Sequence, residues 1–266
     1  MEAAEFQELI WQKGRELFRD MPWREDTAPY KVLVSEIMLQ QTQVDRVIPK
    51  FEAFMLAFAD VEALASASLA EVLKLWQGLG YNRRAKYLHE AAKMVRHDFG
   101  GEFPRTLLDL KKLPGVGENT AGAIMAYSYN QPAVFIETNV RTAYFHHFFD
   151  DDTPVTDKAL RQVVEMTLDQ ENPREFYWAL MDYGAYLKKH RSGHLQKSHH
   201  YKKQSPLKGS VREVRGQIVA ALALSETTEM VLRDALTADQ RFEPALTRLI
   251  KDGLVERDGR LLRLTR

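Results

Sequence analysis

The chain has 266 residues, of which 45% are hydrophobic, so it is long enough for one large or two smaller packed domains. Lys and Arg total 37 and Asp and Glu total 37, so the whole molecule has no net field that attracts a polyanion, and any nucleic-acid surface must be local. The absence of cysteine excludes disulfides, thiolate catalysis and any zinc or iron–sulfur site that cysteines hold.

The first residues lack the basic and apolar regions of a signal peptide, and no apolar run approaches about 18 residues. We therefore expect a soluble, cytoplasmic protein. Apolar residues recur at helical spacing through most of the chain, and strand signals are nearly absent before the C-terminus. Helices are expected at residues 4–19, 30–43, 46–58, 61–65, 69–77, 83–98, 107–112, 120–129, 140–149, 156–168 and 173–187, with a loop at Pro22-Trp23-Arg24.

Two carboxylates stand out against this helical background. Glu36 lies beside the apolar stripe of the helix at 30–43, where a charged residue is more often exposed to solvent. Glu137 follows a short apolar run and precedes a helix, where a carboxylate is also a good N-terminal cap. From the residues alone, both the functional and the structural interpretations stay open.

The segment Leu113–Met125 predicts a helix, a tight hairpin and a second helix. Pro114 ends the first helix, and Gly115 and Gly117 allow the backbone to turn sharply. The free amides at the start of the second helix then suit one phosphate of a nucleic-acid backbone. An ordinary helix–helix turn is the alternative.

The composition changes abruptly at residue 188. Residues 188–208 contain seven Lys or Arg, four His and no acid, so they predict either a basic linker or a strap that contacts phosphates. The paired His199 and His200 are a weak zinc signal, because no carboxylate accompanies them. From residue 209, three short helices and a hairpin about Asp258-Gly259 predict a winged-helix module, with residues 242–249 as its recognition helix.

Several segments together resemble the helix-hairpin-helix base-excision glycosylases, most closely the MutY-type adenine DNA glycosylases. The matching segments span about residues 5–187 and are Pro22–Arg24, Val34–Val44, Leu75–Tyr81, residues 113–120 and Trp178–Gly184. The resemblance implies an all-α, two-lobed fold with the flipped base bound between the lobes. The expected domains are a glycosylase domain at 1–187, the basic segment at 188–208 and the winged helix at 209–266.

The resemblance also assigns roles to the two carboxylates. Excision of adenine needs an acid that protonates the leaving ring and an anion beside the sugar carbon that develops positive charge. Glu36 matches the proton donor of the family, and Glu137 occupies the position of its anion, which is normally aspartate. The extra methylene of Glu137 lengthens its reach by roughly 1.3 Å, and misplacement on that scale can cost about a hundredfold in rate.

Other positions take their expected roles from the same resemblance. Asn119 stands where bifunctional relatives have lysine, so we expect a monofunctional enzyme that leaves an abasic site. Asn119, Asn139 and Arg24 are expected at the base pocket, although Asn139 is equally suited to start a helix. The expected DNA-contacting residues are Gln40, Gln41 and Tyr81, which match the wedge of the family, Gly115, Val116, Gly117 and Thr120 of the hairpin, and Lys188, Lys189, Arg191, Lys197, Lys202 and Lys203 of the basic segment.

The chain also departs from the family. The four cluster-binding cysteines and the Nudix-like domain are missing, so we expect no iron–sulfur cluster and no cofactor, with a monovalent cation at the hairpin as the one option. The expected partner is double-stranded DNA with a damaged or mismatched base, in the nucleoid if the source is bacterial or archaeal, and no membrane. There are two alternatives to adenine excision. The enzyme removes uracil, thymine or another modified base, or the protein is a DNA-binding regulator that has lost catalysis.

Overall fold

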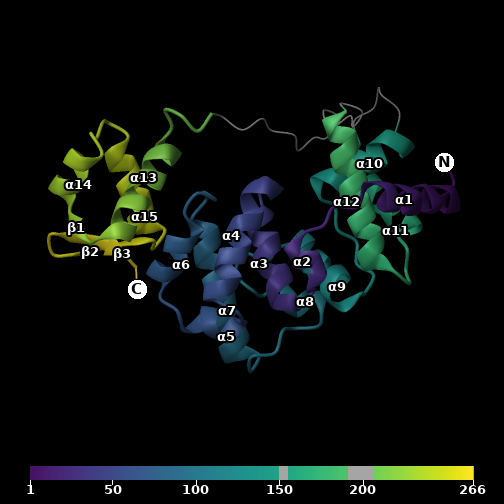
Figure 1. Ribbon diagram of the computed structural model, residues 1–266, viewed down its shortest axis with the longest axis horizontal. Helices are drawn as coiled ribbons and strands as arrows, with labels where there is room; N and C mark the ends of the chain where they lie inside the picture. The colour runs from purple at the N-terminus through teal and green to yellow at the C-terminus, as the bar shows by residue number, and fades with distance from the viewer. Residues whose placement is uncertain (150–154, 191–205, 266) are drawn as a thin grey trace. The chain divides into compact units, whose positions relative to one another are not determined.

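The computed structural model describes residues 1–149, 155–190 and 206–265, which divide into two compact units (Figure 1). Unit 1 comprises Met1–Glu36, Pro104–Lys112 and Val116–Lys203, and unit 2 comprises Ile37–Phe103, Leu113–Gly115 and Gln204–Arg266. The chain therefore passes between the units several times, and helices dominate both. Among the described residues, none of the helices combines the length and apolarity that crossing a bilayer requires.

Unit 1 is built around the long helix α12 (Pro173–Lys189), which packs against α1 (Ala3–Leu17), α9 (Glu118–Tyr129) and α10 (Thr138–Phe148). Pro173 at the first helical position starts α12, because its fixed φ suits that position and its missing N–H is not needed there. The unit also contains α2 (Pro22–Glu25), α8 (Leu107–Leu110), α11 (Asp157–Thr167) and most of α3 (Pro29–Leu39).

The first part of unit 2 packs α5 (Val61–Ser66) and α6 (Leu69–Trp76) against α7 (Arg83–Asp98), and α4 (Val44–Ala57) against α6. Helix α7 buries residues at intervals of three and four along one face, which is the helical spacing of a core-facing stripe. The buried residues of this stripe are Arg84, Ala85, Leu88, His89, Ala91, Ala92 and Val95.

The C-terminal part of unit 2 contains α13 (Val211–Leu224), α14 (Glu229–Ala235), α15 (Phe242–Lys251) and a small antiparallel sheet. The sheet has the strand order β1 (Thr227–Thr228), β3 (Leu261–Leu264), β2 (Val255–Asp258), with Val255 opposite Leu264 and Asp258 opposite Leu261. We call residues 209–265 the C-terminal module. Its helix α13 contacts α6 of the same unit.

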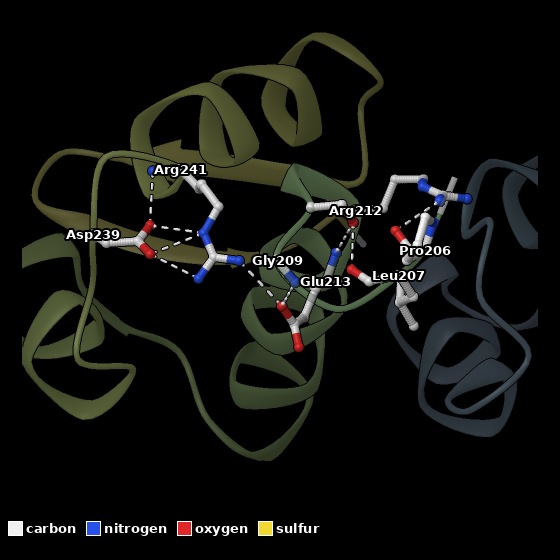
Figure 2. Close-up of polar contacts among 8 residues, drawn as sticks. Pro206, Leu207, Gly209, Arg212, Glu213, Asp239 and Arg241 are labelled. Carbon is white, nitrogen blue, oxygen red and sulfur yellow. Dashed lines mark hydrogen bonds and ion pairs between the residues drawn. The ribbon is translucent and has the colours of Figure 1, made fainter. Parts of the chain in front are cut away.

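The start of α13 is held by a polar network that Figure 2 shows. The Ser210 hydroxyl accepts the backbone N–H of Glu213 as an N-cap, and the Glu213 carboxylate accepts the N–H of Gly209 at 2.8 Å. The same carboxylate pairs with Arg241 at 3.1 Å, and Arg241 is also bound to Asp239. The network therefore ties the first turn of α13 to the chain just before α15.

The structure corrects several expected boundaries. Residues 22–25 form the short helix α2 and not a loop, because Pro22 is suited to a helix N-terminus. Helix α3 ends at Leu39 and not at 43, because Gln41 has a positive φ of 57° that a helix does not accept. Helix α15 begins at Phe242, as expected for the recognition helix, and the Asp239 carboxylate before it accepts the N–H of Arg241 in a local turn.

The short strand β1 is not expected from the sequence, because two residues carry too little pattern to predict a strand. The hairpin about Asp258-Gly259 is expected, and β2 and β3 confirm it, with Gly259 at a φ of 59°.

Candidate active site

Glu36 lies on α3 in unit 1, with a partly buried side chain next to an almost completely apolar helix face. Its neighbours Val32, Leu33 and Val34 are buried, as the periodicity of the segment predicts. Burial is the main reason that the pKa of Glu36 lies well above the ordinary value for glutamate, and the negative charge of Glu137 is the second reason. The protonated form of Glu36 is therefore more favoured than that of an exposed glutamate.

Glu137 occupies the N-cap position of α10, with an extended backbone, but its side chain makes no capping hydrogen bond. The Glu137 carboxylate therefore does not cap the helix N-terminus, although capping was the structural role that the sequence allowed for this residue. Burial raises its pKa also. Because one negative charge opposes the formation of a second, the pair favours one protonated and one ionised carboxyl, and the stronger effects on Glu36 make it the protonated member.

Asn119, in the first turn of α9, is bound to the chain immediately before Glu137. Its side-chain amide donates to the Ile136 carbonyl at 3.1 Å and accepts the Ile136 N–H at 3.2 Å. Asn119 is expected at the base pocket, but here its side chain uses a donor and an acceptor on the backbone of its own chain. Asn119 fixes the position of the residue next to Glu137.

Asn139 lies in the first turn of α10 and approaches α12 through its backbone. A Cβ on Gly184 of α12 would lie 2.1 Å from the Asn139 carbonyl oxygen, a separation that atoms do not tolerate. Only glycine therefore allows α12 to come this close to the start of α10. Gly184, the last residue of the segment 178–184 that matches the family, thus has a local structural reason.

Arg24 is held in a buried ion pair and not exposed in a pocket. Its two terminal nitrogens contact the two Asp182 carboxylate oxygens at 2.7 and 3.0 Å, and Arg19 binds the same carboxylate at 2.7 Å. This paired arrangement satisfies a charge that would otherwise be costly to bury. The guanidinium also lies over the Trp178 ring at 5.4 Å.

Tyr127 is a candidate site residue that the sequence analysis does not identify. Its ring stacks on Trp178 with centroids 6.2 Å apart, and its pKa is raised by burial first and then by Glu36 and Glu137. A neutral phenol thus lies within electrostatic range of both carboxylates. Because Tyr127 follows Thr120 by seven residues, helical spacing predicts only that both lie on the buried face, as they do.

The hairpin has the expected local geometry. Gly115 has a φ of 79°, and its missing Cβ would lie 2.9 Å from the Cβ of Tyr87, so the turn requires glycine here. Gly117 is the N-cap of α9 and offers no side chain to the first amides of the helix. The side chains of Val116 and Thr120 are buried, so a ligand at this turn would meet their backbone atoms.

Comparisons with known proteins decide the family. The family model of the HhH-GPD superfamily base excision DNA repair proteins matches residues 34–167. The chain is also 34% identical over 267 residues to the adenine DNA glycosylase of Mycobacterium tuberculosis, covering 91% of this chain and 88% of that protein. The chain belongs to the HhH-GPD superfamily.

Other relatives of this HhH-GPD protein support the same assignment. The adenine DNA glycosylase of Buchnera aphidicola (strain Sg) is 36% identical over 173 residues, which cover 64% of this chain and 50% of that protein. The chain thus spans about half the length of the first curated relatives it matches. Among solved structures, a thermostable thymine-DNA glycosylase has a TM-score of 0.64 and 28% identity and covers 69% of this chain and 86% of that chain.

Unit 2 of the HhH-GPD protein carries the three residues that match the wedge. Gln40 and Gln41 lie in the turn between α3 and α4, and Tyr81 lies in the turn between α6 and α7. Tyr81 is 39% exposed, so it is not part of the core. Its hydroxyl accepts a hydrogen bond of 2.9 Å from Arg212, in the first turn of α13.

The basic segment is described only at its ends. Lys188 and Lys189 are exposed in the last turn of α12, whereas Arg191, Lys197, Lys202 and Lys203 lie outside the described residues. Within residues 1–149, 155–190 and 206–265, no group of three or more His, Asp or Glu side chains is arranged to hold a metal ion. A cluster bound by cysteines cannot form, because the sequence has no cysteine.

Proposed function

We propose that this HhH-GPD protein is a monofunctional DNA glycosylase that flips a mismatched or damaged base, with adenine favoured, and hydrolyses its N-glycosidic bond. The observation that carries the proposal is the pair of Glu36 and Glu137, in which burial and mutual repulsion separate a protonated from an ionised carboxyl. The family membership and the relatives named adenine DNA glycosylase support it.

In the proposed mechanism, Glu36 donates its proton to the adenine ring as the bond between the base and the sugar C1′ breaks. The base leaves with the electron pair of that bond, and the sugar carbon gains oxocarbenium character. The Glu137 carboxylate stabilises this positive charge. A water molecule then adds its hydroxyl to C1′ and its second proton returns to the carboxyl pair.

The proposal includes no strand cleavage. A lyase of this family needs an amine that forms a Schiff base with the sugar, and Asn119 has none. Its amide is instead bound to the Ile136 backbone, which supports a role in placing Glu137.

We propose that the DNA is held at the hairpin, at the wedge turns and by the basic segment. The amides at the start of α9 are suited to a phosphate, and Glu118 at the same terminus is paired with Arg161 at 3.0 Å, which reduces its repulsion. Lys188 and Lys189 add exposed positive charge at the end of α12. A monovalent cation at the hairpin, which backbone carbonyl oxygens and not acidic side chains would hold, stays a prediction.

The C-terminal module has the element order α13, β1, α14, α15, β2, β3, and we propose that it is a winged helix. We keep the domain limits of 1–187 and 209–266 with the basic segment between them. Several arginines of the module are paired with acids of the same module, which neutralises part of its positive charge. The pairs are Arg233 with Glu229 and Glu243, Arg257 with Glu229, and Arg241 with Glu213.

A second candidate is excision of thymine, which the 28% identity to a thymine-DNA glycosylase favours. One experiment separates the two functions. The purified chain is incubated with duplexes that each contain one mismatch or lesion, and alkali then reveals abasic sites by strand cleavage. We expect cleavage at adenine after alkali and none without it; cleavage only at thymine would replace the first candidate by the second.

The same assay tests the roles of the carboxylates. We expect Glu137→Gln to lose excision and Glu137→Asp to retain or improve it, because aspartate keeps the charge. Full activity in Glu137→Gln would show that Glu137 is not the catalytic anion. Tight binding without cleavage of any duplex would support a regulator that has lost catalysis.

A further inference from the structure

Arg84, at the start of α7, is almost fully buried and binds six oxygen atoms with its two terminal nitrogens. One nitrogen donates to the carbonyls of Ile37, Met38 and Gln40 at 2.7, 2.9 and 2.6 Å. The other donates to the Thr42 hydroxyl at 3.1 Å and to the carbonyls of Leu79 and Gly80 at 3.2 Å each. Because these nitrogens carry four hydrogens, some of the bonds are shared.

The six acceptors belong to two turns that are far apart in sequence. The carbonyls of Ile37, Met38 and Gln40 belong to the end of α3 and the turn after it, which carries Gln40 and Gln41. The Thr42 hydroxyl lies in the same turn. Leu79 and Gly80 belong to the turn before α7, which carries Tyr81. One side chain thus joins the two turns that present the wedge residues.

Both turns hold a residue in a conformation that side chains rarely adopt. Gln41 has a φ of 57° and Tyr81 has a φ of 49°, which is the left-handed region. Such conformations persist only where the surrounding structure enforces them. The hydrogen bonds of Arg84 flank both residues, and the Tyr81 carbonyl accepts the backbone N–H of Arg84 itself at 2.8 Å.

Further contacts hold the guanidinium in place. It lies over the rings of Trp76 and Tyr81 at 5.5 and 5.6 Å, and Trp76 also donates to the Gly80 carbonyl at 3.1 Å. Burial lowers the pKa of Arg84 to about 10, so the group is still charged at neutral pH and all its donors are present.

We propose that Arg84 is a positioning residue for base flipping, which fixes the two wedge turns in the shape that enters the DNA stack before DNA is bound. This inference rests on the proposed function, because it takes Gln40, Gln41 and Tyr81 as the wedge. Arg84 itself does not reach the substrate in this role. It removes the cost of ordering the two turns when the duplex is opened.

Lysine does not replace arginine in this role. A lysine ammonium carries three donors at one point, whereas the guanidinium spreads its donors over a planar fork that reaches two separate turns. Arg84→Lys keeps the positive charge but loses the hydrogen bonds that join the two turns, so it separates the effect of the charge from the effect of these hydrogen bonds. Thr42→Val is a milder variant, since it removes a single acceptor of the six.

The test compares a paired with an unpaired target base. Single-turnover excision of adenine is measured in one duplex where adenine lies opposite 8-oxoguanine and in another where it lies opposite a tetrahydrofuran abasic analogue. We expect Arg84→Lys to slow excision from the paired duplex by about tenfold or more and from the unpaired duplex by less than about threefold. Thr42→Val shifts the same ratio by a smaller factor.

Arg83→Ala is the matched control. Arg83 is the exposed neighbouring arginine, and it contacts Tyr87 and the Asp252 carboxylate, not the two turns. The substitution removes one positive charge, and we expect the ratio of paired to unpaired rates to remain that of the wild type. A far-UV circular dichroism spectrum and a melting curve of each variant establish that it is folded.

A second readout requires no excision. With 2-aminopurine in place of the target adenine, flipping raises its fluorescence, and we expect Arg84→Lys to reduce the amplitude or rate of that rise. A folded Arg84→Lys protein with the wild-type fluorescence rise, or with equal losses on the paired and unpaired duplexes, overturns the inference. If the wild type excises no adenine, the proposed function fails, and the fluorescence comparison still decides the role of Arg84.

Discussion

The Asn119 side chain holds Ile136 by two hydrogen bonds, with its amide nitrogen 3.1 Å from the Ile136 carbonyl and its amide oxygen 3.2 Å from the Ile136 nitrogen. Ile136 immediately precedes Glu137, so these two hydrogen bonds fix the backbone next to the proposed catalytic anion. Position 119, where bifunctional relatives have lysine, and position 137, where the family normally has aspartate, are thus neighbours in space. Asparagine at 119 and the longer acid at 137 form one local arrangement.

We predict that Asn119→Ala lowers kcat for base excision by about tenfold, because Glu137 loses its anchor and small displacements of a catalytic group are costly. DNA affinity is expected to change little, since Asn119 does not contribute charge. Single-turnover kinetics and a binding titration measure the two effects separately. Asn119→Asp is the matched variant, because it keeps the acceptor and loses the donor; a loss of affinity alone in both variants would contradict the role.

We predict that Glu137→Gln lowers the pKa of Glu36, which burial alone then keeps above the ordinary value. The sign follows because the negative charge of Glu137 opposes the ionisation of Glu36, and glutamine removes that charge. Glu36 thus loses its proton at a lower pH in the variant. The measurement is carboxyl carbon NMR of protein labelled at glutamate, with Glu36→Gln assigning the resonance; an unchanged titration would mean that the two groups are not coupled.

We predict that Glu36→Gln makes the protein more stable at pH 8. Because the folded-state pKa of Glu36 is raised above the unfolded value, its favourable contribution is complete below the unfolded pKa and is lost as the pH rises through the folded pKa. Each unit of pKa difference corresponds to about 1.4 kcal/mol, and 1 kcal/mol corresponds to roughly 2–4 °C in Tm for a chain of this size. Melting curves between pH 5 and 9 should show a smaller decline in the variant than in the wild type, and parallel curves would contradict the prediction.

Much of the fold follows from sequence patterns that are local. Apolar spacing predicts most helices, and the alternation about Asp258-Gly259 predicts the terminal hairpin, because both depend on residues close in the chain. The helix at Pro22 and the early end of α3 do not follow from such patterns. The carbonyls of Met38 at the end of α3 and of Gln40 after it accept hydrogen bonds from Arg84, which is more than forty residues further along the chain and shows no pattern that points to these contacts.

Some features of the candidate site could likewise be predicted from the sequence, and others could not. The resemblance led to Glu36 and Glu137, but the residues alone left each open between a functional and a structural role. The pairing of Asn119 with Ile136 and the influence of both carboxylates on the pKa of Tyr127 depend on how distant segments pack. Arg24 is expected at the pocket, but it is bound by Asp182, which lies 158 positions further along the chain. Its ion pair could not be predicted from the sequence around it.

The close approach of Gly184 to Asn139 gives the last prediction. A Cβ at Gly184 would lie 2.1 Å from the Asn139 carbonyl oxygen and 2.8 Å from its Cα, and these are backbone atoms that cannot turn away. Gly184→Ala must therefore push α10, with Glu137 at its N-cap, away from α12. We expect a loss of stability of about 1–3 kcal/mol, as for other overpacked sites, and a fall in excision rate beyond what the remaining folded fraction explains.

Gly216→Ala is the control for this substitution, because Gly216 also lies within a helix but has open space where a Cβ would stand. Apart from the neighbouring backbone of its own helix, no atom of the described residues lies within 4 Å of that position. Alanine there is expected to stabilise the chain by about 0.5–1 kcal/mol, since glycine is unfavourable inside a helix. Urea unfolding gives both stabilities, and excision is measured at a temperature where both variants are folded. A stable and fully active Gly184→Ala protein would show that the start of α10 tolerates displacement, and Glu137 would then need no fixed position for catalysis.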